Sequence, residues 1–379
     1  MQGFAIHAFS PPGDVLALRL RVRDFLAAHQ PKTNAAGRAN PWETADIVFS
    51  RAMGDAGLLG LTWPKKYGGQ DAHILERYVV VEELLAGGAP VGAHWIGDRQ
   101  TGPLILRYGT EEQRKNYLPR MARGECFACI GLSEPGAGSD LASVRTTARR
   151  TDAGWVINGQ KVWTSGAHNA HVMLALVRTQ EGSERNAGLS QLLIDLDTPG
   201  ITIRPIINLV GAHSFNEVFF DDVVVPLGAL VGAEGNGWSQ VTAELAIERS
   251  GPERYLSCHA LLVALIDHAG PDASPPLRAL IGRLTAELWT LRQMSMSVSA
   301  KLANGEDPVV EAAISKDLGN SYEQEMPRLI QDAVEIDLLG EEELAKVLHL
   351  LLLTSPSFSL RGGTREILRG IIARGLGLR

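Results

Sequence analysis

One glutamate in an otherwise apolar pattern is the most suggestive chemical feature of this sequence. Between residues 238 and 266, alternating spacings of three and four define one face of a predicted helix. The face comprises Trp238, Val241, Leu245, Glu248, Pro252, Tyr255, His259, Leu262 and Ile266. Burying a carboxylate is costly and raises its pKa, as a general base acting near neutral pH requires. The pattern therefore marks Glu248 as a candidate base.

A proline follows this glutamate by about one helical turn. Pro252 donates no backbone N–H, and in a helix its ring would clash with the carbonyl of Glu248. We therefore expect a kink here that leaves room for a ligand. Alternatively, Glu248 pairs with Arg249 or Arg254, or lies at the edge of the apolar face. For His259 on the same face, we expect a core histidine whose hydrogen bonds are satisfied.

A second candidate site is the run SEPGAGSD over residues 133–140, which is rich in turn-forming residues. Gly136 and Gly138 allow close approach to the backbone, and Ser139 offers a hydroxyl. Such a loop could bind a phosphate or pyrophosphate through backbone N–H groups, or it could be a plain loop or hairpin. The run is neither a Walker A loop nor a dinucleotide-binding G-x-G-x-x-G turn.

Three further motifs are short. The run KVWTSGA over residues 161–167 places Trp163 beside two hydroxyls, where it could flank a planar ring or simply pack in the core. Thr364 is a predicted helix N-cap, and a helix N-terminus can receive an anion. Cys126 and Cys129 form a C-x-x-C, but no histidine or second pair lies at zinc spacing. We expect these two cysteines to be small apolar side chains without a metal.

These residues fall into three blocks of different character. Residues 1–125 are predicted to form helices, including one over residues 14–30 and another that begins after the N-cap Thr110. Residues 126–236 contain short β-branched segments separated by turn residues, as in an all-β module. The predicted strands are 156–161, 172–177, 192–196 and 217–225. Helical periodicity returns over residues 237–379, so we predict a mainly α protein with a central all-β domain.

Composition excludes several classes of protein. The chain has 379 residues, 45% of them hydrophobic, with a formal net charge of −7 and three cysteines. These values indicate a globular chain that needs no disulfide framework, and they argue against a nucleic-acid partner. No apolar run is long enough to span a membrane. No secretory signal is visible either, so we expect a cytoplasmic protein.

Several motifs, in this order, resemble the acyl-CoA dehydrogenases. The resemblance rests on GLLGLTWPKKYGGQ, YGTEEQRKNYLPRMARGE, CIGLSEPGAGSDLASVRTTARR, GWVINGQKVWTSGA, NEVFFDDVVVP and GGTREILRGIIARGLGL, which span nearly the whole chain. It implies an N-terminal helical domain (1–125), a middle β-barrel domain (126–236) and a C-terminal four-helix bundle (237–379).

The resemblance also implies an FAD cofactor between the β domain and the C-terminal helices. By motif position, Leu132 and Ser133 would contact the isoalloxazine, and Gly138 belongs to the same cofactor-binding loop. Ser139 would contact the pyrophosphate or the CoA part of the substrate. Trp163 would lie against the flavin, and Ser165 would hydrogen-bond near its N5. The C-terminal motif that approaches the cofactor contains Thr364 and Glu366.

The implied reaction is α,β-desaturation of an acyl-CoA thioester, in which a carboxylate takes the α-proton and the flavin N5 accepts the β-hydride. Many family members carry this base directly before the Gly-Thr of the C-terminal motif, where this sequence has Gly362. Isovaleryl- and long-chain-type members carry it on the first long C-terminal helix, before an arginine. That position is Glu248, followed by Arg249, which we assign to substrate binding. The resemblance and the helical pattern thus converge on Glu248.

Two family motifs that contact FAD across a subunit interface are not intact. Their regions read HAGPDASPPLRALIGRL (268–284) and IDLLGEEEL (336–344). The resemblance implies a homo-oligomer, dimer or tetramer, that passes electrons to an electron-transfer flavoprotein. A heteromer is the alternative, because some bacterial relatives acting on steroid-like acyl-CoAs are mixed tetramers. The motifs are also compatible with an acyl-CoA oxidase or related flavin monooxygenase, and with a partner subunit that completes another chain's site.

Overall fold

The structure is a computed structural model that describes residues 5–7, 14–183, 185–248 and 251–378; the side chains of residues 244–248 lie outside this description. The chain forms two compact units. The sheet unit consists of Glu43–Ala72 and Val91–Leu245. The helical unit consists of Met1–Trp42, His73–Pro90 and Ala246–Arg379. The domain boundaries expected at residues 125 and 236 stay a prediction.

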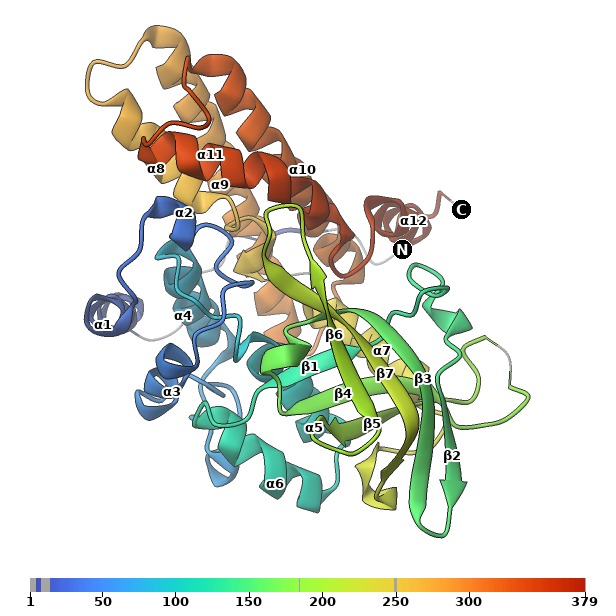
Figure 1. Cartoon of the computed structure of the whole chain (residues 1–379). Coiled ribbons are helices and arrows are strands. Elements are labelled where there is room, and N and C mark those ends of the chain that lie inside the picture. The colour runs from blue at the N-terminus through green and yellow to red at the C-terminus, as the bar shows by residue number, and fades with distance from the viewer. Residues whose placement is uncertain (1–4, 8–13, 184, 249–250, 379) are drawn as a thin grey trace. The chain divides into compact units, whose positions relative to one another are not determined.

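The sheet unit is organised around eight strands (Figure 1). They are β1 Ala128–Gly131, β2 Thr147–Thr151, β3 Gly154–Ser165, β4 Val172–Arg178, β5 Leu189–Asp195, β6 Ile201–Ile207, β7 His213–Val225 and β8 Leu230–Val231. The strand order is β6-β7-β3-β2-β4-β5-β8, and β1 pairs in parallel with β4. The long β3 pairs antiparallel with β7, with register shifts at 157/159 and 161/164. The second shift changes the direction of the side chains at the end of β3.

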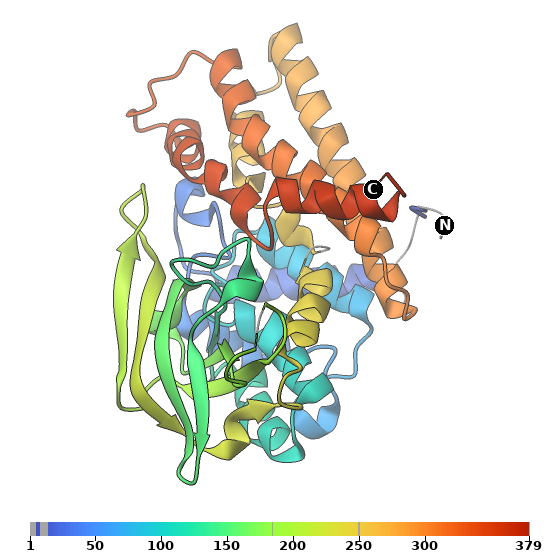
Figure 2. The same cartoon turned by 90° about the vertical axis from the view of Figure 1, so that its right-hand side faces the viewer.

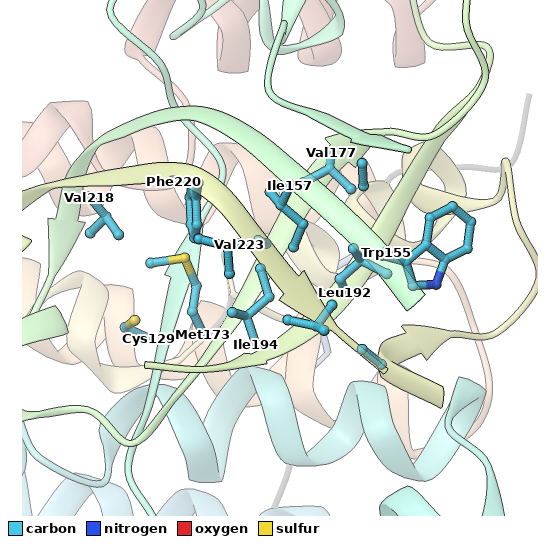
Figure 3. Packing of buried hydrophobic residues seen from close by; sticks show 14 of the residues in the cluster. Cys129, Trp155, Ile157, Met173, Val177, Leu192, Ile194, Val218, Phe220 and Val223 are labelled. Carbon is cyan, nitrogen blue, oxygen red and sulfur yellow. The ribbon is translucent and has the colours of Figure 1, made fainter. Parts of the chain in front are cut away.

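Alternating side chains of these strands form the core of the sheet unit (Figure 3). Trp155 and Ile157 of β3 contribute to it, as do Met173 of β4, Ile194 of β5 and Phe220 of β7. On β3 the odd residues Trp155 and Ile157 point inward, as expected from the two-residue period of a strand. The same alternation carries residue 161 to an inward position at the far end of the strand.

Short helices complete the sheet unit. They are α3 Ile47–Asp55, the π-helix η2 Gly97–Thr101, α5 Gly102–Tyr108, α6 Glu111–Ala122 and α7 Gly237–Glu248, the last of which continues into the helical unit. The 3-10 turns are η1 Lys65–Tyr67, η3 Leu141–Ser143, η4 Ala167–Asn169 and η5 Leu227–Ala229. Helix α6 begins with the expected cap: the Thr110 hydroxyl accepts from the Gln113 N–H, and the Gln113 side chain accepts from the Thr110 N–H. Buried Val241 anchors the start of α7 to a small apolar cluster with Leu132 at its edge.

The helical unit is built mainly from long C-terminal helices. Its elements are α1 Val15–His29, α2 Ala35–Arg38, α4 Ile74–Ala86, η6 Pro252–Arg254, α8 His259–Ala269, α9 Pro275–Ala303, α10 Val309–Ala333, α11 Glu343–Thr354, η7 Ser355–Leu360 and α12 Arg365–Gly375. Helices α9 and α10 run side by side in both views (Figures 1 and 2). The predicted first helix is confirmed as α1, and its N-cap Asp14 accepts from the Ala17 N–H. The predicted mainly α fold with a central sheet and C-terminal helices is confirmed.

The predicted single helix over residues 238–266 is wrong. The described part of helix α7 reaches Glu248, a 3-10 turn occupies Pro252–Arg254, and α8 begins at His259. Gly251, in front of the proline, has an extended backbone with φ −77° and ψ 166°. A proline disfavours the helical conformation of the preceding residue, so the α-helix is interrupted at Gly251 and is not merely kinked. The nine residues of the predicted face therefore do not share one helix.

The expected environment of His259 also needs correction. Its side chain is half-buried, and its Nδ1 has no hydrogen-bond partner among the residues that the structure describes. Burial lowers the pKa of this histidine, whereas the charge of Glu82 acts to raise it. His259 is therefore not a fully satisfied core histidine.

Candidate functional site

The glycine-rich loop is a tight turn with one buried and one open side. It follows β1, and the backbone groups of Glu134 and Ala137 bond to each other in both directions with N–O distances of 3.0 Å. Both residues are buried, whereas Gly136, Gly138 and Ser139 are exposed. A Cβ built on Gly136 or Gly138 would meet no atom within 4 Å. The open side can therefore receive a ligand against its backbone.

A buried ion pair supports this loop from within. Lys161 of β3 is completely buried, and its Nζ donates to Glu134 Oε1 at 2.8 Å and to the Leu132 carbonyl oxygen at 3.2 Å. Burial lowers the pKa of Lys161 to about 8, against the pull of Glu134. Burial alone would raise the pKa of Glu134, but the charge and hydrogen bond of Lys161 bring it below its ordinary value. The carboxylate is therefore ionised at neutral pH.

Trp163 is the most unusual side chain of the sheet unit. Its φ is +58°, a left-handed value that is rare for a bulky residue, and it lies at the register shift between β3 and β7. The indole is 60% exposed and touches Phe215 edge-on, with ring centroids 6.0 Å apart. Strained backbone with an exposed aromatic ring is typical of a ligand-binding position. The alternative that Trp163 packs in the core is wrong.

The loop and the end of β3 are adjacent in the structure. The Val162 N–H donates to the Ser133 carbonyl oxygen at 2.9 Å. Val162 lies between Lys161, which bonds to the Leu132 carbonyl, and Trp163. Ser165 is half-buried and pairs with Phe215 across the strands. The structure thus brings six predicted cofactor contacts into one unit: Leu132, Ser133, Gly138, Ser139, Trp163 and Ser165.

The C-terminal motif belongs to the helical unit. Thr364 is the N-cap of α12, but its side chain makes no capping hydrogen bond. Glu366 is exposed, and its pKa is lowered by hydrogen bonds from its own backbone N–H and then from the Thr364 hydroxyl. Gly362 has φ +61°, a conformation that a glutamate would adopt only with strain. The buried Lys316 Nζ donates to the Gly363 carbonyl at 2.7 Å and so holds this turn.

The candidate base lies at the end of α7. The backbone is helical up to Glu248, but the glutamate side chain lies outside the description. Arg249 lies outside the described residues altogether. The roles of Glu248 and Arg249 therefore stay predictions from the sequence.

The expected apolar environment of the two cysteines is confirmed. Cys126 and Cys129 are free and buried, and they belong to two different apolar clusters. Burial raises the pKa of Cys126 to about 11 and raises that of Cys129 further. Among the described residues, no group of His, Cys, Asp and Glu is arranged to hold a metal ion. Within the same ranges, no helix has the length and hydropathy needed to cross a bilayer.

Two features of the site were missed from the sequence. One is the Lys161–Glu134 pair, which the two-residue alternation of β3 could have revealed, since it places a lysine inward. The other is a stacked pair of histidines, His168 and His213, with ring centroids 3.7 Å apart. The side chain of Asn216 contacts both rings and also donates to the Thr164 carbonyl at 3.0 Å. No local pattern marks this pair, because its members come from η4 and β7.

Comparison with known proteins gives consistent matches. The family model for the acyl-CoA dehydrogenase N-terminal domain matches residues 13–125, and the middle-domain model matches residues 129–223. The acyl-CoA dehydrogenase IpdE1 of Mycobacterium tuberculosis is 37% identical, covering 96% of this chain and 98% of the relative. IpdE1 of Mycolicibacterium smegmatis is 36% identical, again covering 96% of this chain and 98% of the relative.

Two solved structures are similar over their full length. The Tcur3481-Tcur3483 steroid ACAD is 28% identical with a TM-score of 0.86, covering 98% of this chain and 99% of that chain. The ChsE4-ChsE5 complex from Mycobacterium tuberculosis is also 28% identical, with a TM-score of 0.84 and coverage of 98% and 100%. The likeness therefore includes both units of the chain.

Proposed function

The chain belongs to the acyl-CoA dehydrogenase family, and from that premise we propose that it desaturates an acyl-CoA thioester between its α and β carbons. As a member it is a flavoprotein oxidoreductase of lipid metabolism, with FAD as its cofactor. The observation that carries the proposal is Trp163: an exposed indole on strained backbone, beside a loop whose glycines leave its outer side open.

The residues of the sheet unit fit this cofactor. Gly138 presents no side chain to a ligand approaching the loop, and exposed Ser139 offers a hydroxyl there to the pyrophosphate or to CoA. Leu132 and Ser133 would border the isoalloxazine, with Trp163 against the ring and Ser165 as a hydrogen-bond partner near N5. When bound, FAD supplies the acceptor for the β-hydride. In the C-terminal motif, Thr364 and Glu366 would add contacts from the helical unit.

We assign the proton abstraction to Glu248. A carboxylate is needed to take the α-proton, and the alternative family position is Gly362, which has no side chain and a left-handed backbone. The described part of α7 reaches Glu248, and the backbone at Gly251 is extended before the 3-10 turn Pro252–Arg254. Hydrogen bonds to the thioester oxygen would stabilise the charge that develops as the proton leaves. Arg249, the next residue, would bind substrate together with Ser139.

The test is Glu248→Gln, with Glu244→Gln as the control one helical turn earlier on α7. Mixed anaerobically with a panel of straight-chain, branched and steroid-type acyl-CoAs, wild type and Glu244→Gln should lose flavin absorbance with at least one substrate. Glu248→Gln should keep its FAD and show no bleaching, because the amide cannot take the proton. Unchanged bleaching in Glu248→Gln would refute the assignment of the base.

The electron acceptor is proposed to be an electron-transfer flavoprotein. The alternative, transfer to O₂ as in an acyl-CoA oxidase or related flavin monooxygenase, predicts a different result. After substrate reduction, the flavin of a dehydrogenase should stay reduced in air for many turnover times and reoxidise when an electron-transfer flavoprotein is added. Fast reoxidation in air with release of peroxide would favour the alternative.

A second candidate function is that of one subunit in a heteromeric enzyme acting on a steroid-type acyl-CoA. It is favoured by the degenerate cross-subunit motifs at 268–284 and 336–344, together with the similarity to the Tcur3481-Tcur3483 steroid ACAD and the ChsE4-ChsE5 complex. For a homo-oligomer we expect one FAD per chain after purification of this chain alone. Absence of FAD in that preparation, restored by co-expression with a partner chain, would support the heteromer.

A further inference from the structure

Lys161 lies between the two segments that carry the proposed flavin contacts. Its ammonium is completely buried and bonds to Glu134 Oε1 at 2.8 Å and to the Leu132 carbonyl at 3.2 Å. The next residue, Val162, donates its N–H to the Ser133 carbonyl at 2.9 Å. One side chain and one backbone bond thus join the start of the loop to the end of β3.

Glu134 extends this connection to the other end of the loop. Its carboxylate accepts from the backbone N–H of Arg145 at 2.6 Å and from that of Thr146 at 2.9 Å, in addition to the bond from Lys161. The exposed residues of the loop therefore lie between two anchored ends. Because the partners are backbone groups, the pair defines where the main chain of the loop lies.

Trp163 needs such support. A left-handed backbone of φ +58° at a bulky residue costs about 1–2 kcal/mol. Such a conformation persists only where surrounding contacts hold the backbone in place. Lys161, two residues earlier, is the last fully buried side chain before the register shift at 161/164. Its bonds hold the strand at the point where the chain turns into the left-handed conformation.

The pair is a poor source of stability. Complete burial of an ammonium is costly, and the lowered pKa of Lys161 reports that burial outweighs the attraction of Glu134. Replacing a buried pair by neutral groups of similar volume is often harmless or stabilising. The retained pair is better explained by the geometry that it imposes than by the free energy of folding.

We propose that Lys161 and Glu134 are a positioning pair that holds the Leu132–Ser133 segment and the Trp163–Ser165 segment at the separation that FAD requires. The inference rests on the proposed flavin contacts of these segments. Neither charged side chain needs to touch the flavin, because each acts through the backbone groups that it binds.

The test uses two variants and one matched control. Lys161→Met removes the cation, and Lys161→Met/Glu134→Gln removes both charges while one side-chain oxygen remains as an acceptor for one of the two N–H groups. The control Lys301→Met breaks another ion pair of low exposure, Lys301–Glu311 at 2.5 Å, which belongs to the helical unit. For each variant we would measure urea unfolding and the Kd for FAD on the apoprotein, and the visible flavin spectrum and flavin reduction potential on the FAD-bound protein.

We expect the double variant to fold, with some stability lost at the N–H group that is left without an acceptor. We expect it to bind FAD about tenfold or more weakly, as loss of supporting groups does at metal sites. Its flavin spectrum and potential should shift, whereas Lys301→Met should change only stability. A double variant whose Kd stays within about twofold of wild type, with an unchanged spectrum, would overturn the proposal. If Lys161→Met does not fold, the double variant decides alone, because it contains no uncompensated buried charge.

Failure of the proposed function would appear elsewhere. A wrong base shows in Glu248→Gln, and wrong flavin contacts show as an unchanged FAD affinity in Trp163→Gly. Neither variant alters the pair. Weakened FAD binding in the double variant together with full bleaching in Glu248→Gln would keep the positioning pair and reject only the base.

Discussion

Replacing Trp163 by glycine should leave the stability of the apoprotein nearly unchanged but weaken FAD binding. In the apoprotein, glycine removes the strain of the left-handed backbone, which is about 1–2 kcal/mol for a bulky residue. The losses are the edge-on contact with Phe215, about 0.5–1.5 kcal/mol, and the greater entropy of glycine in the unfolded chain, about 0.5–1 kcal/mol. Because the indole is 60% exposed, these effects nearly cancel. We expect a free energy of unfolding within about 1 kcal/mol of wild type.

The matched control is Trp155→Gly on the same strand. Trp155 is 1% exposed and donates its Nε1–H to the Leu227 carbonyl at 3.3 Å. Truncation of a buried tryptophan costs about 3–5 kcal/mol, so this variant should lose far more stability than Trp163→Gly. Urea unfolding of the two apoproteins, followed by far-UV circular dichroism, measures the difference.

Binding of FAD should distinguish Trp163→Gly from wild type. Loss of an aromatic contact with the flavin should weaken FAD binding about 2- to 10-fold, measured by titrating the apoprotein. A Trp163→Gly variant that is destabilised by about 3 kcal/mol or more would refute the strain argument. One that binds FAD as wild type does would refute the contact.

Three further predictions concern single side chains. Gly138→Ala should leave stability nearly unchanged and weaken FAD binding, whereas Gly131→Ala should destabilise the fold, because a Cβ there would lie 2.5 Å from a side-chain sulfur; urea unfolding and FAD titration compare them. Cys126 and Cys129 should not react with a thiol reagent at pH 8 until the protein unfolds, since burial raises both pKa values; labelling with and without urea tests this. Between pH 8 and 10.5 the Lys161 side chain is protonated in the unfolded chain but not in the folded chain. As the pH rises through this range, wild type should therefore gain up to about 3 kcal/mol of stability relative to Lys161→Met. Parallel pH profiles of stability for the two proteins would contradict this.

Local patterns were sufficient for much of the secondary structure. The helix over residues 14–30, the capping box of Thr110 and Gln113, and the β-branched runs of β3 and β4 depend on patterns of a few residues, so the sequence predicts them directly. The strands β1, β2, β6 and β8 were missed, because short or exposed strands carry little signal of their own. The helix of 238–266 failed for a local reason as well: the steric effect of Pro252 on Gly251 outweighed the apolar periodicity.

Some features of the candidate site likewise follow from the sequence, and others only from the tertiary structure. Motif order along the chain was enough to name the family, the cofactor and the residues that would contact it, because those residues lie in contiguous runs such as 133–140 and 161–167. The charge partner of Lys161, the left-handed backbone of Trp163 and the stacking of His168 on His213 came only with the tertiary structure. The ion pair joins residues 27 positions apart, and the histidine stack joins residues 45 apart. The register shift at Trp163 places Thr164 opposite Asn216, 52 positions away. No local preference encodes such contacts, since they arise from strand pairing, register and the exclusion of water.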